Sequence, residues 1–162
     1  MLLIFDSINN LSFGKLMAVY EEGNSENAAL FYRNMDRNAA ILRAEQDFYG
    51  YLEDYFFRTK GAFYAIWVEN DSYISALRME PFHDGYLLEA LETSPAYRRR
   101  GFALQLMKAV LSTMNTTVYS HVSKDNTASM RCHEACGFVC ISDTAEMISG
   151  EISNQFSTWR WR

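Results

Sequence analysis

The sequence has few of the residues that break or loosen a fold. Its 162 residues include only 2 prolines and 8 glycines, and charged residues make up 22% of them. Disordered segments and low-complexity linkers are richer in proline, glycine or charge. The hydrophobic fraction of 49% is large enough for a core. We therefore expect one ordered domain spanning residues 1–162.

Long apolar runs and long basic runs are also absent. No stretch approaches the roughly 20 apolar residues of a membrane span, and Met1–Asn10 lacks the basic flank of a secretion signal. The 15 basic and 20 acidic residues give a net charge of -5, and no long basic run is present to follow a phosphate backbone. These features predict a cytoplasmic protein that binds neither nucleic acids nor membranes.

Cysteine is scarce as well. Cys132, Cys136 and Cys140 are an odd number and lie close together, unlike the disulfide framework of a small secreted domain. With His133 they suggest a metal-binding protein as an alternative, but a four-residue spacing across a helix end does not match the common zinc patterns. We predict free thiols that pack as small buried apolar side chains, and no metal site.

Hydrophobic periodicity predicts an α+β protein. Strands are expected at Leu2–Phe5, Ala62–Glu69, Ser72–Glu80, Tyr86–Thr93, Thr117–Val122, Phe138–Ile141 and Gln155–Trp161. Helices are expected at Ser12–Glu21, Phe102–Met114 and Asn126–Cys136, with two more within Ser25–Phe57 that are separated near Asn38. The central strand–helix–strand unit should be right-handed, so its two strands should run parallel.

Three consecutive arginines, Arg98 to Arg100, stand directly before the expected helix at Phe102. The positive end of a helix dipole disfavours cations by roughly 0.3–1 kcal/mol each. A bound phosphate would offset this repulsion, and Gly101 and Ala103 are small enough to let it approach the backbone N–H groups. The alternative is a solvated basic turn.

The segment Arg98–Ala103 fits the pattern Gln/Arg-x-x-Gly-x-Gly/Ala, and it follows a strand and Pro95. Asn126 and the Gly137-Phe138 pair form a second block about thirty residues downstream. Together they resemble the GNAT superfamily of acetyl-coenzyme A-dependent N-acetyltransferases. The resemblance implies a mixed, twisted sheet of about six to seven strands with helices on both faces and a β-α-β core that binds coenzyme A.

The resemblance also implies roles for individual residues. Leu91 and Thr93 would offer backbone groups to the pantetheine arm and the thioester, and Asn126 would contact the same arm. The pyrophosphate would lie on the backbone N–H groups of Arg98, Arg99, Arg100, Gly101, Phe102 and Ala103. Position 93 departs from the family, which usually has a hydrophobic residue there.

Acetyl transfer to an amine needs a group that removes a proton, because a primary amine of pKa about 10.4 is protonated at neutral pH. Glu89 is the first candidate and Glu92 the second, with Glu80 in reserve. Strict alternation along the strand predicts that Glu89 and Glu92 face opposite sides of the sheet. Ordinary solvated carboxylates are the alternative.

A proton donor for the leaving thiolate is the other catalytic requirement. His133 stands where many family members have a tyrosine, and helical spacing places it on the face of Asn126. A histidine near pKa 6.5 can donate a proton, although packing inside the domain is an equal alternative. Tyr97 and Tyr119 are reserve donors.

The expected reaction is direct attack of an amine on acetyl-coenzyme A in a ternary complex, without a metal or a covalent enzyme intermediate. The acceptor is a small-molecule amine or a peptide or protein amine, and the aromatic residues of 48–57 would form either a wall of its pocket or a part of the core. A homodimer is compatible with the sequence. The alternative function is a coenzyme A-binding regulatory module that has lost turnover.

Overall fold

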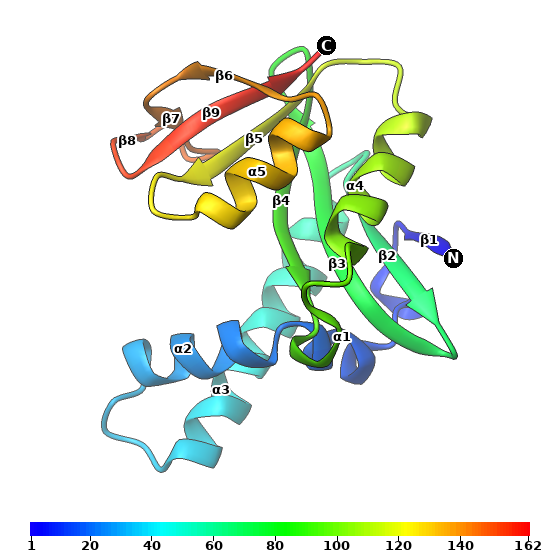
Figure 1. Cartoon of the computed structure of the whole chain (residues 1–162). Coiled ribbons are helices and arrows are strands. Elements are labelled where there is room, and N and C mark those ends of the chain that lie inside the picture. The colour runs from blue at the N-terminus through cyan, green and yellow to red at the C-terminus, as the bar shows by residue number, and fades with distance from the viewer.

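A mixed sheet of seven strands forms the centre of the molecule (Figure 1). The computed structural model describes residues 1–162. The strand order is β1-β2-β3-β4-β5-β9-β6, and all neighbours are antiparallel except β4 and β5. The strands are β1 (Leu2–Phe5), β2 (Phe63–Glu69), β3 (Ser72–Phe82), β4 (Gly85–Thr93), β5 (Val118–Ser123), β6 (Val139–Ser142) and β9 (Phe156–Trp161). Two short strands, β7 (Ala145–Glu146) and β8 (Ile152–Ser153), form a separate hairpin.

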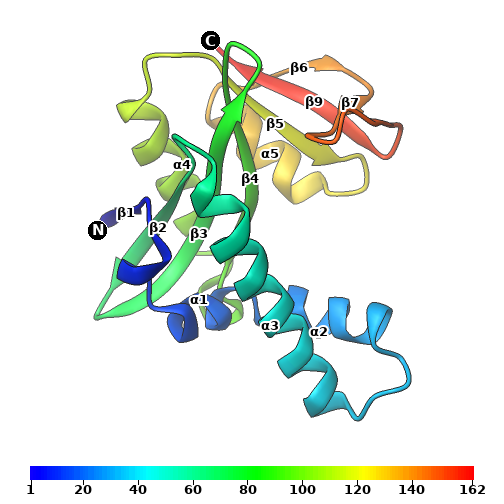
Figure 2. The same cartoon turned by 180° about the vertical axis from the view of Figure 1, so that it is seen from behind.

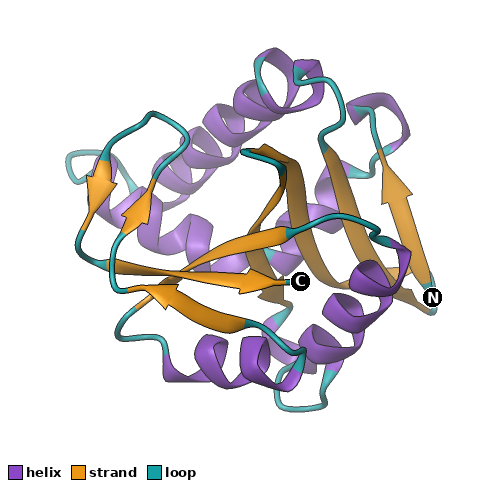
Figure 3. Cartoon of the chain, turned by 90° about the horizontal axis from the view of Figure 1, so that it is seen from above, coloured by secondary structure: helices purple, strands orange, loops and turns teal.

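Helices cover both faces of the sheet, as the view from above shows (Figure 3). One face carries α1 (Phe13–Val19) and α3 (Arg37–Asp54), and the other carries α4 (Phe102–Thr113) and α5 (Thr127–Ala135). Between α1 and α3 in the chain, α2 (Glu21–Phe31) runs beside α3, and this helical pair extends beyond the end of the sheet (Figures 1 and 2). Short 3-10 turns occupy Ile8–Asn10, Phe56–Arg58 and Pro95–Tyr97. None of the helices combines the length and the apolar character needed to cross a membrane.

Two hydrophobic clusters hold these layers together. The first packs α1 and α3 on β2 and β3, where Leu16, Leu52 and Tyr64 are fully buried. The second packs α4 on the opposite face, with Leu106 and Met107 fully buried. The central strands therefore face a layer of helices on each side, which explains why residues 73–80 are buried almost throughout.

A β-bulge in β4 changes which residues share a face. Arg78 on β3 lies opposite Glu89, and Ala76 lies opposite Glu92, so three steps along β4 match two steps along β3. Ala90 has a φ of 49°, in the left-handed region. The extra residue puts Glu89 and Glu92 on the same face of the sheet, toward the layer of α1–α3. The prediction that they face opposite sides was wrong, because alternation is interrupted at Ala90.

The strands β4 and β5 then diverge. Their parallel pairing covers only Tyr86–Leu88 and Val118–Ser120, although β4 continues to Thr93. The predicted parallel pair is confirmed. Beyond these residues β4 and β5 are no longer hydrogen-bonded to each other. Their separation leaves a space between α4 and α5.

The predicted fold class is confirmed, with three differences in the elements. The break in the long helical region lies at residues 32–36 and not near Asn38, because the Asp36 side chain accepts hydrogen bonds from the backbone N–H groups of Asn38 and Ala39 and starts α3 there. Residues 22–24, expected between two helices, lie inside α2. The β7–β8 hairpin was not predicted, since two-residue strands leave no periodic signal.

The approach of β4 to the segment before β5 yields a prediction about stability. A Cβ atom at Gly85 would lie 2.0 Å from the carbonyl oxygen of Thr117, which itself accepts a hydrogen bond from the N–H of Tyr86. We expect Gly85→Ala to lower the free energy of unfolding by roughly 2 kcal/mol or more, because backbone must move. Urea denaturation measures this change.

The matched control is Gly50→Ala, since Gly50 lies inside α3 and its added Cβ meets nothing within 4 Å. Better helix propensity should raise stability there by roughly 0.5–1 kcal/mol. Equal stability of the two variants would contradict the close approach at Gly85.

Candidate functional site

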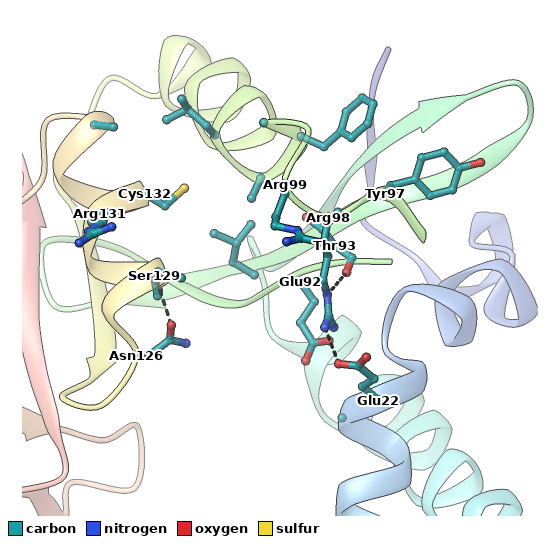
Figure 4. A pocket seen from close by; sticks show the side chains of 18 of the residues that line it. Glu22, Glu92, Thr93, Tyr97, Arg98, Arg99, Asn126, Ser129, Arg131 and Cys132 are labelled. Carbon is teal, nitrogen blue, oxygen red and sulfur yellow. Dashed lines mark hydrogen bonds and ion pairs between the residues drawn. The ribbon is translucent and has the colours of Figure 1, made fainter. Parts of the chain in front are cut away.

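A cavity of about 760 Å³ lies in the space between α4, α5 and the end of β4 (Figure 4). We call it the main cleft. The end of β4 contributes Leu91, Glu92 and Thr93, and α2 contributes Glu22 and Gly23 at one edge. The remaining lining residues come from the turn before α4, from α4 itself and from α5: Tyr97, Arg98, Arg99, Gly101, Phe102, Ala103, Leu104, Asn126, Ala128, Ser129, Arg131, Cys132 and Ala135, with Glu26 from α2.

The turn before α4 has the backbone geometry of an anion-binding turn, and we call it the cradle. Gly101 is the N-cap of α4 with a φ of 82°, and Arg99 also has a positive φ of 60°. The first helical hydrogen bond runs from the N–H of Gln105 to the carbonyl of Gly101. The backbone N–H groups of the helix that precede Gln105 therefore have no partner within the helix. Free N–H groups in such a turn at the positive end of a helix favour a phosphate.

The three arginines of this turn do different things. Arg98 donates a hydrogen bond of 3.1 Å to the carbonyl of Thr93 and forms an ion pair with Glu22, which ties α2 to the end of β4. The guanidinium of Arg100 lies over the ring of Tyr97 at 5.5 Å, and Arg100 does not line the main cleft. Arg98 and Arg99 do line it, as Figure 4 shows.

Asn126 and the residues of α5 form the other wall. The Asn126 side chain accepts a hydrogen bond of 2.9 Å from the N–H of Ser129 and thereby caps α5 (Figure 4). Its NH2 group stays free of this cap. The first turn of α5 therefore presents amide and hydroxyl groups to the cleft opposite the cradle.

The end of β4 is held in place from β3. The hydroxyl of Ser75 donates a 2.6 Å hydrogen bond to the carbonyl of Glu92, and the hydroxyl of Thr93 donates to Ser75 at 3.0 Å. This explains the threonine at position 93, where a hydrophobic residue was expected from the family pattern. Leu91 and Thr93 consequently lie in the cleft with fixed backbone groups.

Glu92 is the carboxylate that the fold brings to the centre of the site. It lines the main cleft and also a second cavity behind it. Burial raises the pKa of Glu92, the Arg98 charge lowers it, and the neighbouring Glu26 and Glu22 raise it. A Cβ atom at Gly23 would come within 3.0 Å of the Glu92 carboxylate, so glycine leaves the room that this side chain occupies.

The second cavity, of about 650 Å³, lies between α2, α3 and the sheet. Its lining combines aromatic, amide and charged residues: Tyr20, Gly23, Asn24, Asn27, Phe31, Tyr32, Ala44, Asp47, Phe48, Arg78, Ala90 and Glu92. Of the aromatic residues in 48–57, only Phe48 lines it, while Leu52 and Phe56 are fully buried in the core. Sequence reasoning missed Arg78 and Asp47, although an arginine inside the apolar strand segment 73–79 is an identifiable signal.

Glu89, the first candidate base, lies elsewhere on the same face. It lines neither cavity, and its carboxylate forms an ion pair of 3.7 Å with Arg78. Beside it, Glu80 is only 2% exposed. Burial and the hydrogen bond and charge of Glu89 raise the pKa of Glu80 to about 7. Glu92 therefore lies between the two cavities, and Glu89 does not.

His133, the candidate acid, is turned into the domain. It is 2% exposed, and its ring nitrogens lie 2.8 Å from the Ser129 carbonyl and 2.8 Å from the Ser120 hydroxyl on β5. Burial lowers its pKa, while the Ser129 carbonyl raises it. His133 does not line the main cleft with Asn126, because the helical turn from Ser129 onward directs its ring at the sheet.

The remaining candidates are distributed around the site. Tyr97 lines the main cleft, whereas Tyr119 donates a hydrogen bond of 2.7 Å to Asp84 at the opposite end of β4. The cysteines are free thiols, and Cys132 lines the cleft. No three histidine, cysteine or acidic side chains are arranged so that they would share a metal ion.

The chain is similar to acetyltransferases in sequence family and in fold. The sequence model of the acetyltransferase (GNAT) family matches residues 27–138. No curated protein matches the sequence significantly.

Solved structures share the fold across nearly the whole chain. Escherichia coli ElaA has a TM-score of 0.62 at 14% identity, covering 100% of this chain and 99% of that chain. The PaiA N-acetyltransferase of Thermoplasma acidophilum, in complex with coenzyme A, has a TM-score of 0.63 at 12% identity, covering 99% and 98%. The spermidine N-acetyltransferase of Vibrio cholerae, in complex with coenzyme A and spermine, has a TM-score of 0.60 at 17% identity, covering 98% and 92%.

The buried carboxyl of Glu80 yields a prediction about pH. Its pKa is raised from an ordinary 4.5 to about 7, so between these values the folded chain keeps a proton that the unfolded chain has lost. This contribution to stability is present below pH 4.5 and is lost as the pH rises through 7. We expect Glu80→Gln to exceed the wild type in free energy of unfolding by roughly 1–3 kcal/mol at pH 8 and to match it at pH 4.5.

Urea denaturation at the two pH values measures the difference. The exposed Glu134 is the control, and Glu134→Gln should leave the pH dependence unchanged. A Glu80→Gln variant with the same pH dependence as the wild type would refute the assignment.

Proposed function

Because this chain belongs to the GNAT acetyltransferase family, whose sequence model matches residues 27–138, we propose that it moves an acetyl group from acetyl-coenzyme A to a primary amine. The main cleft binds acetyl-coenzyme A, and the amine enters through the second cavity. One observation carries this proposal: Glu92 lines both cavities and is the only ionisable residue common to them.

The proposed position of acetyl-coenzyme A follows from the polarity of the main cleft. The pyrophosphate lies on the N–H groups of Arg98 to Ala103, where the positive φ of Gly101 and the helix dipole favour an anion. Arg99 adds a free positive charge, while Arg98 is held by Glu22. The pantetheine arm runs along the backbone of Leu91 and Thr93, and Asn126 contacts it from the opposite wall.

The proposed reaction takes place where the two cavities meet. Glu92 accepts the proton of the substrate ammonium, and its raised pKa makes it a better base than a solvated carboxylate. The amine nitrogen forms a bond to the thioester carbon, and a backbone N–H at the end of β4 stabilises the oxyanion. The carbon–sulfur bond then breaks, and the second proton that the attached nitrogen loses goes to the departing thiolate of coenzyme A, which leaves as the thiol.

The leaving thiolate needs little help from an acid, since a thiol of pKa about 8.5 is a fair leaving group. Tyr97 lines the main cleft and is our proposed donor if one acts. The position of His133, with both ring nitrogens engaged by Ser129 and Ser120, does not support direct proton donation from it. We assign His133 to the packing of α5 on β5.

Binding of acetyl-coenzyme A tests the first half of the proposal. We expect Gly101→Glu to weaken binding at least about 100-fold, because a carboxylate replaces the anion that the helix start and the arginines attract. Isothermal titration calorimetry measures the dissociation constant.

Gly150→Glu is the matched control for this experiment. Gly150 has a φ of 84°, close to that of Gly101, and its added Cβ also meets nothing within 4 Å. It lies in the β7–β8 turn, so the same strain and charge should leave affinity unchanged. Equal affinity of both variants would contradict the cradle, and a wild type that does not bind would refute the proposal.

Loss of the proposed base tests the second half. We expect Glu92→Gln to lower kcat about 100- to 1,000-fold in a thiol-release assay with an amine panel. Because Glu92 acts ionised and its pKa is raised, wild-type activity should rise with pH through that pKa, and the variant should lose this limb of the profile.

Glu89→Gln is the comparison, and it should lower kcat much less because Glu89 lines neither cavity. A larger effect at Glu89 than at Glu92 would reverse our assignment. Tight binding of acetyl-coenzyme A without thiol release for any amine would instead indicate a regulatory module without turnover.

A further inference from the structure

The guanidinium of Arg78 is a largely buried charge without a hydrogen-bonded partner. Arg78 lies in the middle of β3, its side chain is 16% exposed, and it lines the second cavity. Its Nε is buried and has no hydrogen-bond partner. Its one ion pair joins Nη2 to the Glu89 carboxylate at 3.7 Å, which is longer than a hydrogen bond.

The surroundings fix the guanidinium but do not satisfy it. Its centre lies 5.0 Å from the ring of Tyr51 and 5.7 Å from the ring of Phe56. Two nearby phenols are engaged with other groups, since Tyr64 donates to the hydroxyl of Tyr20 and Tyr20 donates to the carbonyl of Ala90. Buried donors are normally paired, and an unpaired charged one is costly.

The other charged residues of the second cavity have assigned partners. Asp47 accepts a hydrogen bond from Tyr32 and forms an ion pair of 3.2 Å with Arg43. Glu92 faces the main cleft and is our proposed base. Arg78 is therefore the charged group of this cavity whose hydrogen-bonding capacity is left for a ligand, and a carboxylate is the acceptor that matches a guanidinium best.

We propose that Arg78 binds a carboxylate of the acceptor, so that the acceptor is a small amine that also carries a carboxylate. This inference rests on the proposed function. The amine lies at Glu92 and the carboxylate at Arg78, whose planar fork matches a carboxylate with two parallel N–H···O bonds.

The spacing of the two residues suits a small molecule. Arg78 and Glu92 lie on neighbouring strands, and they are two residues apart along β3 because Glu92 pairs with Ala76. This offset corresponds to about 8 Å between their Cα atoms. Both side chains face the layer of α1–α3 because of the bulge at Ala90, so an amino acid bridges them. A polycation would meet the positive charge of Arg78 at this end of the cavity.

Matched pairs of probes test the inference: α-amino acids and the amines that lack only the carboxylate, such as histidine with histamine, lysine with cadaverine and tryptophan with tryptamine. We expect the wild type to turn over the amino acid of at least one pair with a kcat/KM at least about 10-fold above that of its amine. Arg78→Met should remove this preference through KM, and Arg78→Lys should restore part of it. Preference for the amines, or an equal loss for both members of a pair in Arg78→Met, would overturn the inference.

Binding is measured separately from turnover, as the shift of Tm caused by each probe in the presence of coenzyme A. Arg78 does not line the main cleft, so Arg78→Met should bind acetyl-coenzyme A with unchanged affinity, and this binding shows that the variant is folded. If Arg78→Met does not fold, the same measurements are made on Arg78→Lys. Amino acids that stabilise the wild type but not the variant, without thiol release, would support the inference and refute acetyl transfer. No shift and no turnover with any amino acid would overturn the inference.

Discussion

The extra residue in β4 is the constraint on which both cavities depend. With regular pairing, Glu92 would face the layer of α4 and would not line the second cavity. The bulge instead shifts the register between Ala76 and Arg78 on β3 and carries Ala90 into the left-handed region at a φ of 49°. Such a conformation costs roughly 1 kcal/mol or more for a residue with a side chain. The two hydrophobic clusters on either side of the sheet hold it in place.

The arrangement of charge follows from this geometry. Cations gather at the start of α4, where they disfavour the helix unless an anion is bound. Carboxylates gather directly beside these cations, at the α2 edge of the main cleft, where Glu22, Glu26 and Glu92 line it. The ion pair of Arg98 with Glu22 joins the two groups. The cleft thus has a positive region beside a negative one, which suits the phosphate and the ammonium group of our proposal.

The fold class and the turn before α4 could be predicted from the sequence, but the orientation of the side chains around the site could not. The order of helices and strands along the chain and the Arg98–Ala103 turn depend on local patterns, and the structure agrees with the predicted fold class. The face of Glu92 depends on one residue, Ala90, whose left-handed φ has no signal in its identity. The direction of His133 depends on its bonds to Ser120 and Ser129, and helical spacing alone cannot choose between two neighbouring faces.

The buried charges beside the second cavity are best understood as a cost to the fold. Glu80, Glu89 and Arg78 occupy positions on the central strands where apolar residues of similar size would stabilise the domain at least as well. One carboxylate oxygen of Glu80 is buried without a hydrogen-bond partner, and the Nε of Arg78 is as well. A cluster needed only for stability would be fully hydrogen-bonded. Arg78 lines a cavity that reaches Glu92 near the end of β4, which is where the acceptor of our proposal would complete its hydrogen bonding, so a residue that lowers the stability of the free chain would raise its affinity for the acceptor.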